Sequence, residues 1–228
     1  MDPALDNVFW HALVGSHAQF AVGSGGARRY APGLSPIIAF EDVERPDFAS
    51  LAPHCEVGEK LYCSGWFGAV PAGWQLHVEA PMDRMVWGAD VEPPDAPVDD
   101  ALPLQAPRDA DATVELAELT KPGPFGPRTI ELGDYLGCFD AERRLVAMAG
   151  ERVQAGLLRE ISGVCTHPEF QGRGLARRLM AMLIRRQLQR GETPFLNVLP
   201  SNAGAHALYR RMGFRVRVET NVRIISRG

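Results

Sequence analysis

Cysteine and histidine are scarce in this sequence, which has four cysteines and six histidines among its 228 residues. The spacing of Cys55, Cys63, Cys138 and Cys165 matches neither a zinc site nor a CxxC redox pair, and no His-x-x-x-His pair occurs. We therefore expect no metal centre and no disulfide framework. The cysteines are interpreted as small core residues of a protein in a reducing compartment.

Long hydrophobic runs are also missing. No stretch approaches the roughly 18 apolar residues of a transmembrane helix, and the mean hydropathy is -0.12. The opening MDPALDNVFWHALVG carries aspartates where a secretory signal has basic residues. It predicts instead an amphipathic helix with Asp2 as its cap and Leu5, Phe9, Ala12 and Leu13 on one face. We expect a cytoplasmic protein with no membrane partner.

Charge is unevenly distributed along the chain. The net charge is -4, but residues 173–228 hold twelve arginines and two glutamates, so the other 172 residues carry -14. A basic segment can bind a polyanion, or its arginines can simply line the wet faces of helices. Overall acidity and the small number of aromatic residues among these arginines argue against nucleic acid.

A proline-rich stretch divides the sequence. Residues 93–107 hold five prolines and three aspartates, which exclude a long helix and a central strand. We interpret this stretch as a linker between an N-terminal α+β region, 1–102, and a C-terminal domain, 103–228. In the first region, the alternating residues 74–79 predict a strand that forms a hairpin with 61–67.

The C-terminal domain alternates strand and helix patterns, which is typical of an α/β sheet that is mixed because some connections are tight turns. Helices are predicted at 109–119, 174–189 and 202–212. Strands are predicted at 135–139, 144–149, 157–166, 195–199, 214–218 and 222–225.

The stretch ISGVCTHPEFQGRGLARR, residues 161–178, joins the longest strand to a helix. The first turn of a helix has unpaired N–H groups and a partial positive charge, so it attracts anions. Gly172 and Gly174 remove the Cβ atoms that would keep a phosphate away, and Arg173 together with Arg177 or Arg178 adds donors. The pattern predicts a diphosphate site; the alternative is a tight turn and nothing more.

The same stretch resembles the acyl-coenzyme A signature of the GNAT superfamily of N-acyltransferases, Gln/Arg-x-x-Gly-x-Gly/Ala. Gln171, Gly174 and Ala176 occupy its three defined positions. Residues 194–214 resemble the strand and helix that follow the signature in that family. The resemblance covers roughly residues 103–228 and implies a mixed, mostly antiparallel central sheet with flanking helices. Residues 1–102 show no signature; they are either a degenerate half of the same fold or an unrelated substrate-handling domain.

The resemblance implies acetyl-CoA as co-substrate, with no metal. Backbone groups of the strand before the signature would hold the pantetheine arm and the thioester, and Asn202 would cap its helix or bond the pantetheine amide. The cofactor-binding residues implied are Val164, Cys165, Thr166, Gln171, Gly172, Arg173, Gly174, Leu175, Ala176, Arg177 and Asn202. Cys165 is interpreted as a packing residue rather than an acyl-accepting nucleophile.

Two catalytic residues are implied as well. Glu160 lies eleven residues before Gln171, where some family members carry the general base. In a regular strand it would share a face with Ser162, Val164 and Thr166; the alternative is an ion pair with Arg152 or Arg159. Tyr209 matches the tyrosine that protonates the departing thiolate in the family. The alternative is that Tyr209 has only a structural role in the interface between helix and sheet.

The sequence therefore predicts an acyl-CoA-dependent N-acyltransferase that moves acetyl to a primary amine by direct attack in a ternary complex. The partner would be a small-molecule or peptide amine, and a homodimer is among the expected assemblies. The alternative is a non-catalytic acyl-CoA sensor or interaction module.

Overall fold

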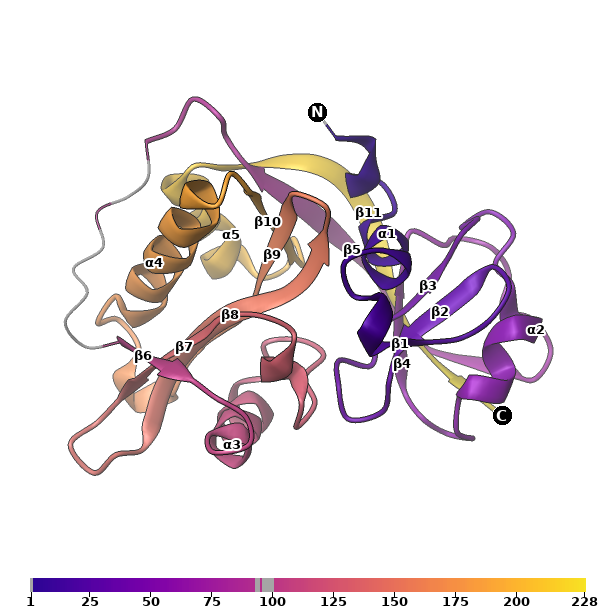
Figure 1. Cartoon of the computed structure of the whole chain (residues 1–228), viewed down its shortest axis with the longest axis horizontal. Coiled ribbons are helices and arrows are strands. Elements are labelled where there is room, and N and C mark those ends of the chain that lie inside the picture. The colour runs from indigo at the N-terminus through magenta and orange to yellow at the C-terminus, as the bar shows by residue number, and fades with distance from the viewer. Residues whose placement is uncertain (1, 93–94, 96–100) are drawn as a thin grey trace.

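The computed structural model describes residues 2–92, 95 and 101–228. An eight-stranded sheet with strand order β4-β11-β5-β10-β9-β8-β7-β6 runs through the molecule, beside a three-stranded sheet β1-β2-β3 (Figure 1). The helices are α1 (Val8–Val14), α2 (Phe48–Leu51), α3 (Ala110–Thr120), α4 (Leu175–Gln189) and α5 (Ala203–Met212). The strands are β1 (Ala21–Val22), β2 (Ala27–Tyr30), β3 (Ile38–Phe40), β4 (Leu61–Ser64), β5 (Trp74–Trp87), β6 (Ala101–Leu104), β7 (Tyr135–Phe139), β8 (Leu145–Ala155), β9 (Leu158–Thr166), β10 (Thr193–Val198) and β11 (Phe214–Arg227).

The predicted mixed α/β sheet is confirmed, with the strand and helix order expected for the C-terminal domain. Two strand predictions there are wrong. Strand β8 continues to Ala155, well past the predicted 144–149. Strand β11 is one strand rather than two, because its ladder with β5 passes through two β-bulges that bend it without ending the pairing.

Part of the predicted linker is a strand. Residues 101–104 form β6, which pairs antiparallel with β7 at the edge of the sheet. An edge strand tolerates Pro103, since proline has no N–H to donate to a ladder. Residues 93–94 and 96–100 of the linker lie outside the described residues.

The predicted hairpin between 61–67 and 74–79 is wrong. Strand β4 pairs with β11, and β11 lies between β4 and β5. Strand β5 pairs with β11 along its length and with β10 at Val86 and neighbouring residues. The main sheet therefore contains strands from both sides of the predicted boundary at residue 102.

The order of elements in the N-terminal region favours the degenerate-half interpretation. The series α1, β1, β2, β3, α2, β4, β5 matches α3, β7, β8, β9, α4, β10, β11, with α5 as the addition in the second half. A parallel bridge links Ile37, next to β3, to Tyr62 of β4, as β9 and β10 are parallel. The last strands are exchanged, because β5 lies against β10 and β11 against β4.

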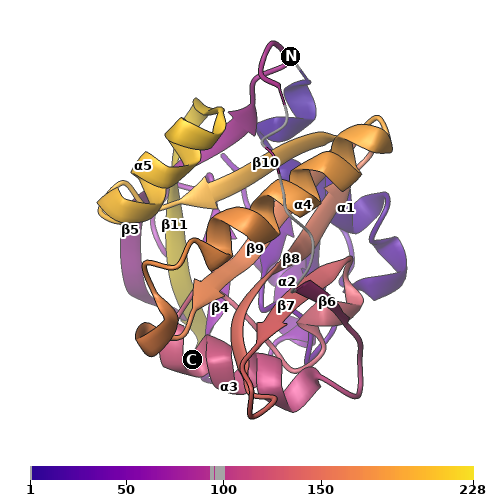
Figure 2. The same cartoon turned by 90° about the vertical axis from the view of Figure 1, so that its left-hand side faces the viewer.

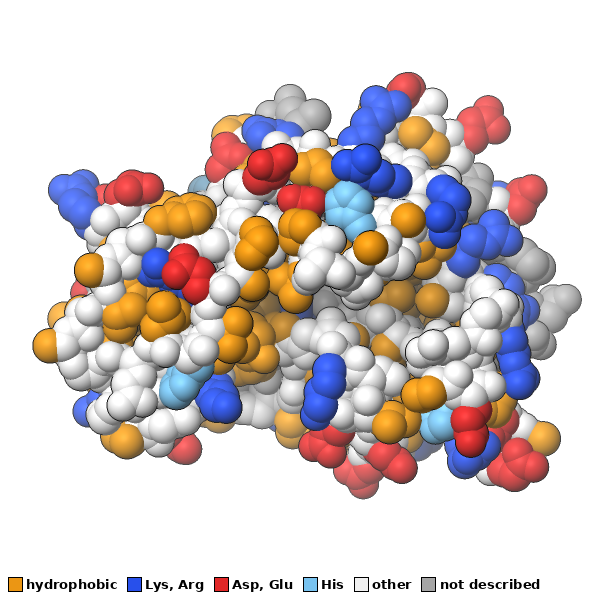
Figure 3. All heavy atoms as spheres, turned by 180° about the vertical axis from the view of Figure 1, so that it is seen from behind, with side chains coloured by type: hydrophobic (Ala, Val, Ile, Leu, Met, Phe, Trp, Pro, Cys, Tyr) orange, Lys and Arg blue, Asp and Glu red, His pale blue; other side chains and the backbone are white. Residues whose placement is uncertain are grey.

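Helices cover both faces of the main sheet. Helices α4 and α5 lie together on one face (Figure 2), and in the core there Leu179, Leu183 and Met212 belong to one cluster with Leu196. Helix α1 packs on the opposite face, and α3 packs against β7, β8 and β9. Seen from behind, the surface is hollowed between the two halves and bordered by hydrophobic side chains (Figure 3).

The N-terminal helix is interrupted. Residues Pro3–Leu5 form a short 3-10 turn, whose Ala4 amide donates to the Asp2 carboxylate, and α1 begins at Val8. The predicted face is confirmed, since Leu5, Phe9, Ala12 and Leu13 are all buried.

Candidate functional site

The N-terminus of α4 is open. Gly172 and Gly174 have φ of 76° and 75°, and a Cβ at either would meet no atom within 4 Å. Within the described chain, no side chain caps the first turn of this 15-residue helix. Its amides from Leu175 onward therefore face free space beside two glycines, as an anion site requires.

The corresponding place in the N-terminal half is closed. Helix α2 follows β3 as α4 follows β9, but its cap residue is Asp47, whose carboxylate accepts from the Ser50 amide. The same carboxylate accepts from the Gly26 amide. A negative charge on the helix N-terminus leaves no place for a diphosphate, so only the C-terminal half keeps the open turn.

Strands β9 and β10 part next to this turn. Their parallel ladder runs from Leu158 opposite Thr193 to Glu160 opposite Phe195 and goes no further within the described residues. Strand β9 also carries a bulge at Gly163, where φ is 62° and pairing with β8 slips. The parting and the bulge free backbone groups near the end of β9.

A cavity of about 600 Å³ lies at the parting of the strands. It brings together most of the residues that the signature implies, from β9, from the turn, from α4 and from α5. Those residues are Val164, Cys165, Thr166, Gln171, Gly172, Gly174, Leu175, Ala176, Arg177, Asn202 and Tyr209.

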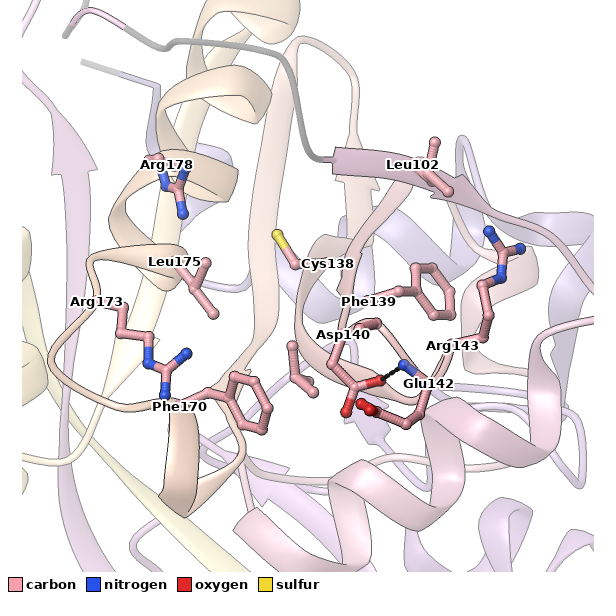
Figure 4. Close-up of a pocket in the computed structure, with 12 residues that line it drawn as sticks. Leu102, Cys138, Phe139, Asp140, Glu142, Arg143, Phe170, Arg173, Leu175 and Arg178 are labelled. Atoms are coloured by element: carbon pink, nitrogen blue, oxygen red, sulfur yellow. Dashed lines mark hydrogen bonds between the residues drawn. The ribbon is translucent and has the colours of Figure 1, made fainter.

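Arg173 points elsewhere. It lines a second cavity of about 710 Å³ between the β7–β8 turn and α4, together with Asp140 and Arg178 (Figure 4). Its guanidinium lies 4.6 Å from the ring centre of Phe170 and donates to the Glu169 carbonyl. The two cavities share Phe170 and Leu175 as lining residues, so these side chains lie between them.

Tyr209 and Asn202 lie on α5. The Asn202 side chain caps the helix by accepting from the Ala205 amide at 3.2 Å, as the sequence predicts. Tyr209 lies two turns further along, in the cavity, with 8% of its surface exposed. Burial, and then the nearby Cys165 thiol, raise the pKa of Tyr209 to about 12. The hydroxyl therefore stays protonated at neutral pH and can donate.

Cys165 is a packing residue in its contacts. It is buried among Leu116, Tyr135 and Met148. Burial raises the pKa of its thiol to about 11, so the nucleophilic thiolate is scarce at neutral pH.

Glu160 is held in a buried ion pair. Its two carboxylate oxygens accept from Nη2 and Nε of Arg152 at 2.7 and 2.9 Å. One oxygen also accepts from the Asn197 amide at 2.7 Å, and only 1% of the residue is exposed. The pairing with Arg152 that the sequence leaves open as an alternative is therefore present. Glu160 does not line the 600 Å³ cavity.

The prediction that Glu160 shares a face with Val164 is wrong, because β9 is not regular. Ile161 and Val164 both pack on the α4 side although they are three residues apart, while Cys165 packs on the α3 side. The bulge at Gly163 reverses the alternation of faces. Glu160 therefore points to the α3 side, as Cys165 does.

Sequence reasoning missed several lining residues. Thr120, Lys121 and Pro122 reach the cavity from the end of α3, where Lys121 has a left-handed φ of 51°. The Lys-Pro pair signals a helix end, but only tertiary packing brings it to β9. The other missed lining residues are Phe170, Gly204, Ala205 and Leu208.

The described residues contain neither a cluster placed to bind a metal ion nor a helix that could span a membrane. Over residues 2–92, 95 and 101–228, no group of three or more His, Cys, Asp or Glu side chains is placed to hold a metal ion. No helix in the described part of the chain is long and apolar enough to cross a membrane.

Comparison with known proteins finds a family model and solved structures that are similar to this chain. The family model described as FR47-like protein matches residues 135–224. A solved structure of a GNAT-family protein from Novosphingobium aromaticivorans, classed with the acetyltransferases, is 33% identical with a TM-score of 0.87. That match covers 100% of both chains.

More distant structures share the fold. A GCN5-related N-acetyltransferase from Kribbella flavida is 17% identical with a TM-score of 0.61, over 100% of this chain and 97% of that chain. A GCN5-related N-acetyltransferase-like protein from Streptococcus suis is 14% identical with a TM-score of 0.59, over 96% and 92%. Among curated proteins, none matches the chain.

Proposed function

We propose, from the premise that this chain belongs to the GNAT family of acetyltransferases, that it transfers acetyl from acetyl-CoA to a primary amine. The observation that carries the proposal is the open N-terminus of α4 beside Gly172 and Gly174, at the mouth of the cavity that contains Tyr209.

The residues around the cavity fit acetyl-CoA. The free amides of the turn and of the first turn of α4 would hold the diphosphate, with Gln171 and Arg177 beside it. The backbone of residues 164–166, next to the bulge, would hold the pantetheine arm, and an amide there would polarise the thioester carbonyl. Arg173 lies in the neighbouring cavity, so the only contact that we propose for it is with the outer part of the nucleotide.

Acetyl transfer requires a proton donor for the departing sulfur and a proton acceptor for the attacking amine. The amine nitrogen attacks the thioester carbon, an N–C bond forms, and the C–S bond breaks. Tyr209 donates its hydroxyl proton to the departing sulfur, since it is protonated and lies in the cavity.

The proton of the attacking amine needs an acceptor. Glu160 is fully buried, so it would receive this proton through water rather than by contact with the amine. Its carboxylate accepts three hydrogen bonds from Arg152 and Asn197 and has about four lone-pair positions, which leaves one for a water.

The proposal is tested by thermal unfolding with acetyl-CoA. The wild type is expected to melt at a higher temperature with millimolar acetyl-CoA, and Gly174→Glu is expected to lose this shift, since its carboxylate would meet the diphosphate. Gly156→Glu is the matched control. Gly156 also has a left-handed φ (59°) and open space around it, but lies in the β8–β9 turn. A wild type that shows no shift contradicts the proposal.

A second candidate is a sensor that binds acyl-CoA without turnover. The ion pair of Glu160 with Arg152 favours it, because both carboxylate oxygens are already engaged by Arg152 and the side chain does not line the cavity. Release of free thiol from acetyl-CoA in the presence of amines separates the two functions: an enzyme releases it, and a sensor shifts the melting temperature alone.

A further inference from the structure

The hydroxyl of Tyr135, at the start of β7, has no hydrogen-bond partner in the described part of the chain. The residue is 2% exposed, and burial raises the pKa of this phenol, so it remains protonated. A buried hydroxyl without a partner is uncommon in folded proteins and costs stability. Its partner is therefore to be sought outside the protein.

Two glycines make room for this side chain. A Cβ on Gly150 would overlap the Tyr135 ring, and a Cβ on Gly163 would lie 3.2 Å from the ring and 3.7 Å from the hydroxyl oxygen. The hydroxyl thus lies next to the bulge of β9 at Gly163, the residue before Val164. It lies on the side of the strand that faces α3.

The neighbours of Tyr135 belong to the proposed reaction centre. Cys165, which lines the 600 Å³ cavity, packs in the same cluster as Tyr135. Charges on Arg152 and Glu160 act on its phenol. Phe125, in the loop after α3, meets the Tyr135 ring edge to face and is only partly buried. Tyr135 lines neither the 600 Å³ nor the 710 Å³ cavity, so an amine reaches this hydroxyl only after a neighbouring side chain moves, and the partly buried Phe125 is the one whose movement the inference requires.

A second buried tyrosine in the same region provides the contrast. The hydroxyl of Tyr30 lies 2.9 Å from Nδ1 of His17 and 3.4 Å from the carbonyl oxygen of Arg152. The fold therefore supplies partners to one of these two tyrosines and leaves the other without one. The unpartnered hydroxyl is the one next to the bulge.

We propose that the Tyr135 hydroxyl hydrogen-bonds the acceptor amine as it reaches the thioester from the α3 side of the sheet. The inference rests on the acetyl transfer proposed above. The phenol oxygen accepts a hydrogen bond from an amine N–H and so turns the nitrogen lone pair toward the carbonyl carbon. The N–C bond forms and the C–S bond breaks as before, and the amine proton passes by water to Glu160, so Tyr135 ends the step unchanged.

The test compares Tyr135→Phe with Tyr30→Phe in the full-length protein. Three quantities are measured: the melting temperature alone, its shift with acetyl-CoA, and thiol release from acetyl-CoA. The probe amines are benzylamine and the peptide Ala-Ala-Ala. Buffer without added amine measures the thiol released by hydrolysis, in which water is the acceptor. Tyr135→Phe is expected to melt at or above the wild-type temperature, to keep the acetyl-CoA shift, and to release thiol at least 10-fold more slowly. Tyr30→Phe is expected to melt lower and to keep its rate per folded molecule.

Each result has a defined meaning. If Tyr135→Phe melts as low as Tyr30→Phe, the hydroxyl has a structural partner and the inference is overturned. Unchanged thiol release by Tyr135→Phe also overturns it, and the proposed acetyl transfer then stands if the wild type turns over. If the wild type neither shifts with acetyl-CoA nor releases thiol, the proposed function fails first and this inference with it.

Discussion

At the scale of single residues, burial sets the chemistry of the side chains that the sequence singles out. Tyr209 and Cys165 both have raised pKa values because burial disfavours their charged forms. Tyr209 is thereby kept as a proton donor, and Cys165 is kept as a neutral thiol. The same low exposure forces Glu160 into its pair with Arg152.

Replacing Tyr209 with phenylalanine should slow turnover by about 100-fold or more, because general acid catalysis typically contributes about 10²- to 10⁴-fold. The acetyl-CoA concentration at half-maximal rate should change little, since the hydroxyl acts on the leaving sulfur. Steady-state thiol release at saturating amine measures both values. Equal turnover in the variant and the wild type would remove Tyr209 from the mechanism.

Glu160→Gln should lower both stability and turnover. The change leaves the buried Arg152 guanidinium without its carboxylate, which typically costs about 3–5 kcal/mol. Glu192→Gln is the matched control, because Glu192 is also buried and paired, with Arg159 and Arg190. Urea unfolding and thiol release per folded molecule are measured for both. If Glu160→Gln keeps its rate as Glu192→Gln does, the base is another group.

Because His17 is buried, we expect the free energy of unfolding to fall in mild acid. Its pKa is lowered from 6.5 to about 4, mainly by burial and then by Arg159. Between these values the unfolded chain binds a proton that the folded chain excludes, so stability falls as the pH drops from 6.5 to 4. The full effect is about 3 kcal/mol.

Urea unfolding at pH 7.5 and pH 4.5 measures this effect. His17→Gln, which cannot be protonated and can still bond Tyr30, should lose less stability over that interval than the wild type. The difference between the two proteins isolates His17 from the carboxylates that also titrate there. Identical losses would show that His17 is already protonated or exposed in the fold.

At the scale of elements, β9 and the two equivalent helices α2 and α4 determine which half of the fold has an open turn beside a cavity. The bulge at Gly163 reverses the faces of β9, so that Val164 lies on the α4 side and Cys165 on the α3 side. Helix α4 has an open N-terminus, whereas α2, its counterpart in the first half, is capped by Asp47. One half of the fold thus keeps the open turn that the proposed acetyl-CoA site requires, and in the other half the corresponding turn is closed.

At the scale of the whole molecule, the exchange of strands ties the halves together. Strand β5 lies between β10 and β11, so residues 103–228 alone would expose the long edges of both. The core beneath α2 likewise includes Ile225 of β11. The two halves are therefore expected to fold as one unit.

A fragment of residues 103–228 should lack cooperative melting and bind no acetyl-CoA, because unpaired edge strands of this length favour aggregation. The matched control is the full chain cleaved once within residues 93–100, which keeps both pieces and should melt cooperatively. Circular dichroism during heating measures both. A cooperative transition and an acetyl-CoA shift in the fragment alone would contradict this expectation.

Local patterns determined a large part of this protein. The helix of residues 174–189, the cap at Asn202 and the glycine turn before α4 depend on interactions between near neighbours in the chain, which the sequence shows directly. The same is true of the family signature, since its residues lie within one strand, one turn and one helix. These local features account for most of the residues that line the 600 Å³ cavity.

Tertiary structure decided the rest. The partner of β5, the bulge that turns Glu160 away from Val164, and the approach of Lys121 to the cavity all depend on residues far apart in the sequence. Alternation along a strand shows which residues share a face, but it names no partner strand and assumes no bulge. Likewise, an orphaned hydroxyl such as that of Tyr135 becomes visible only when every possible partner has been placed.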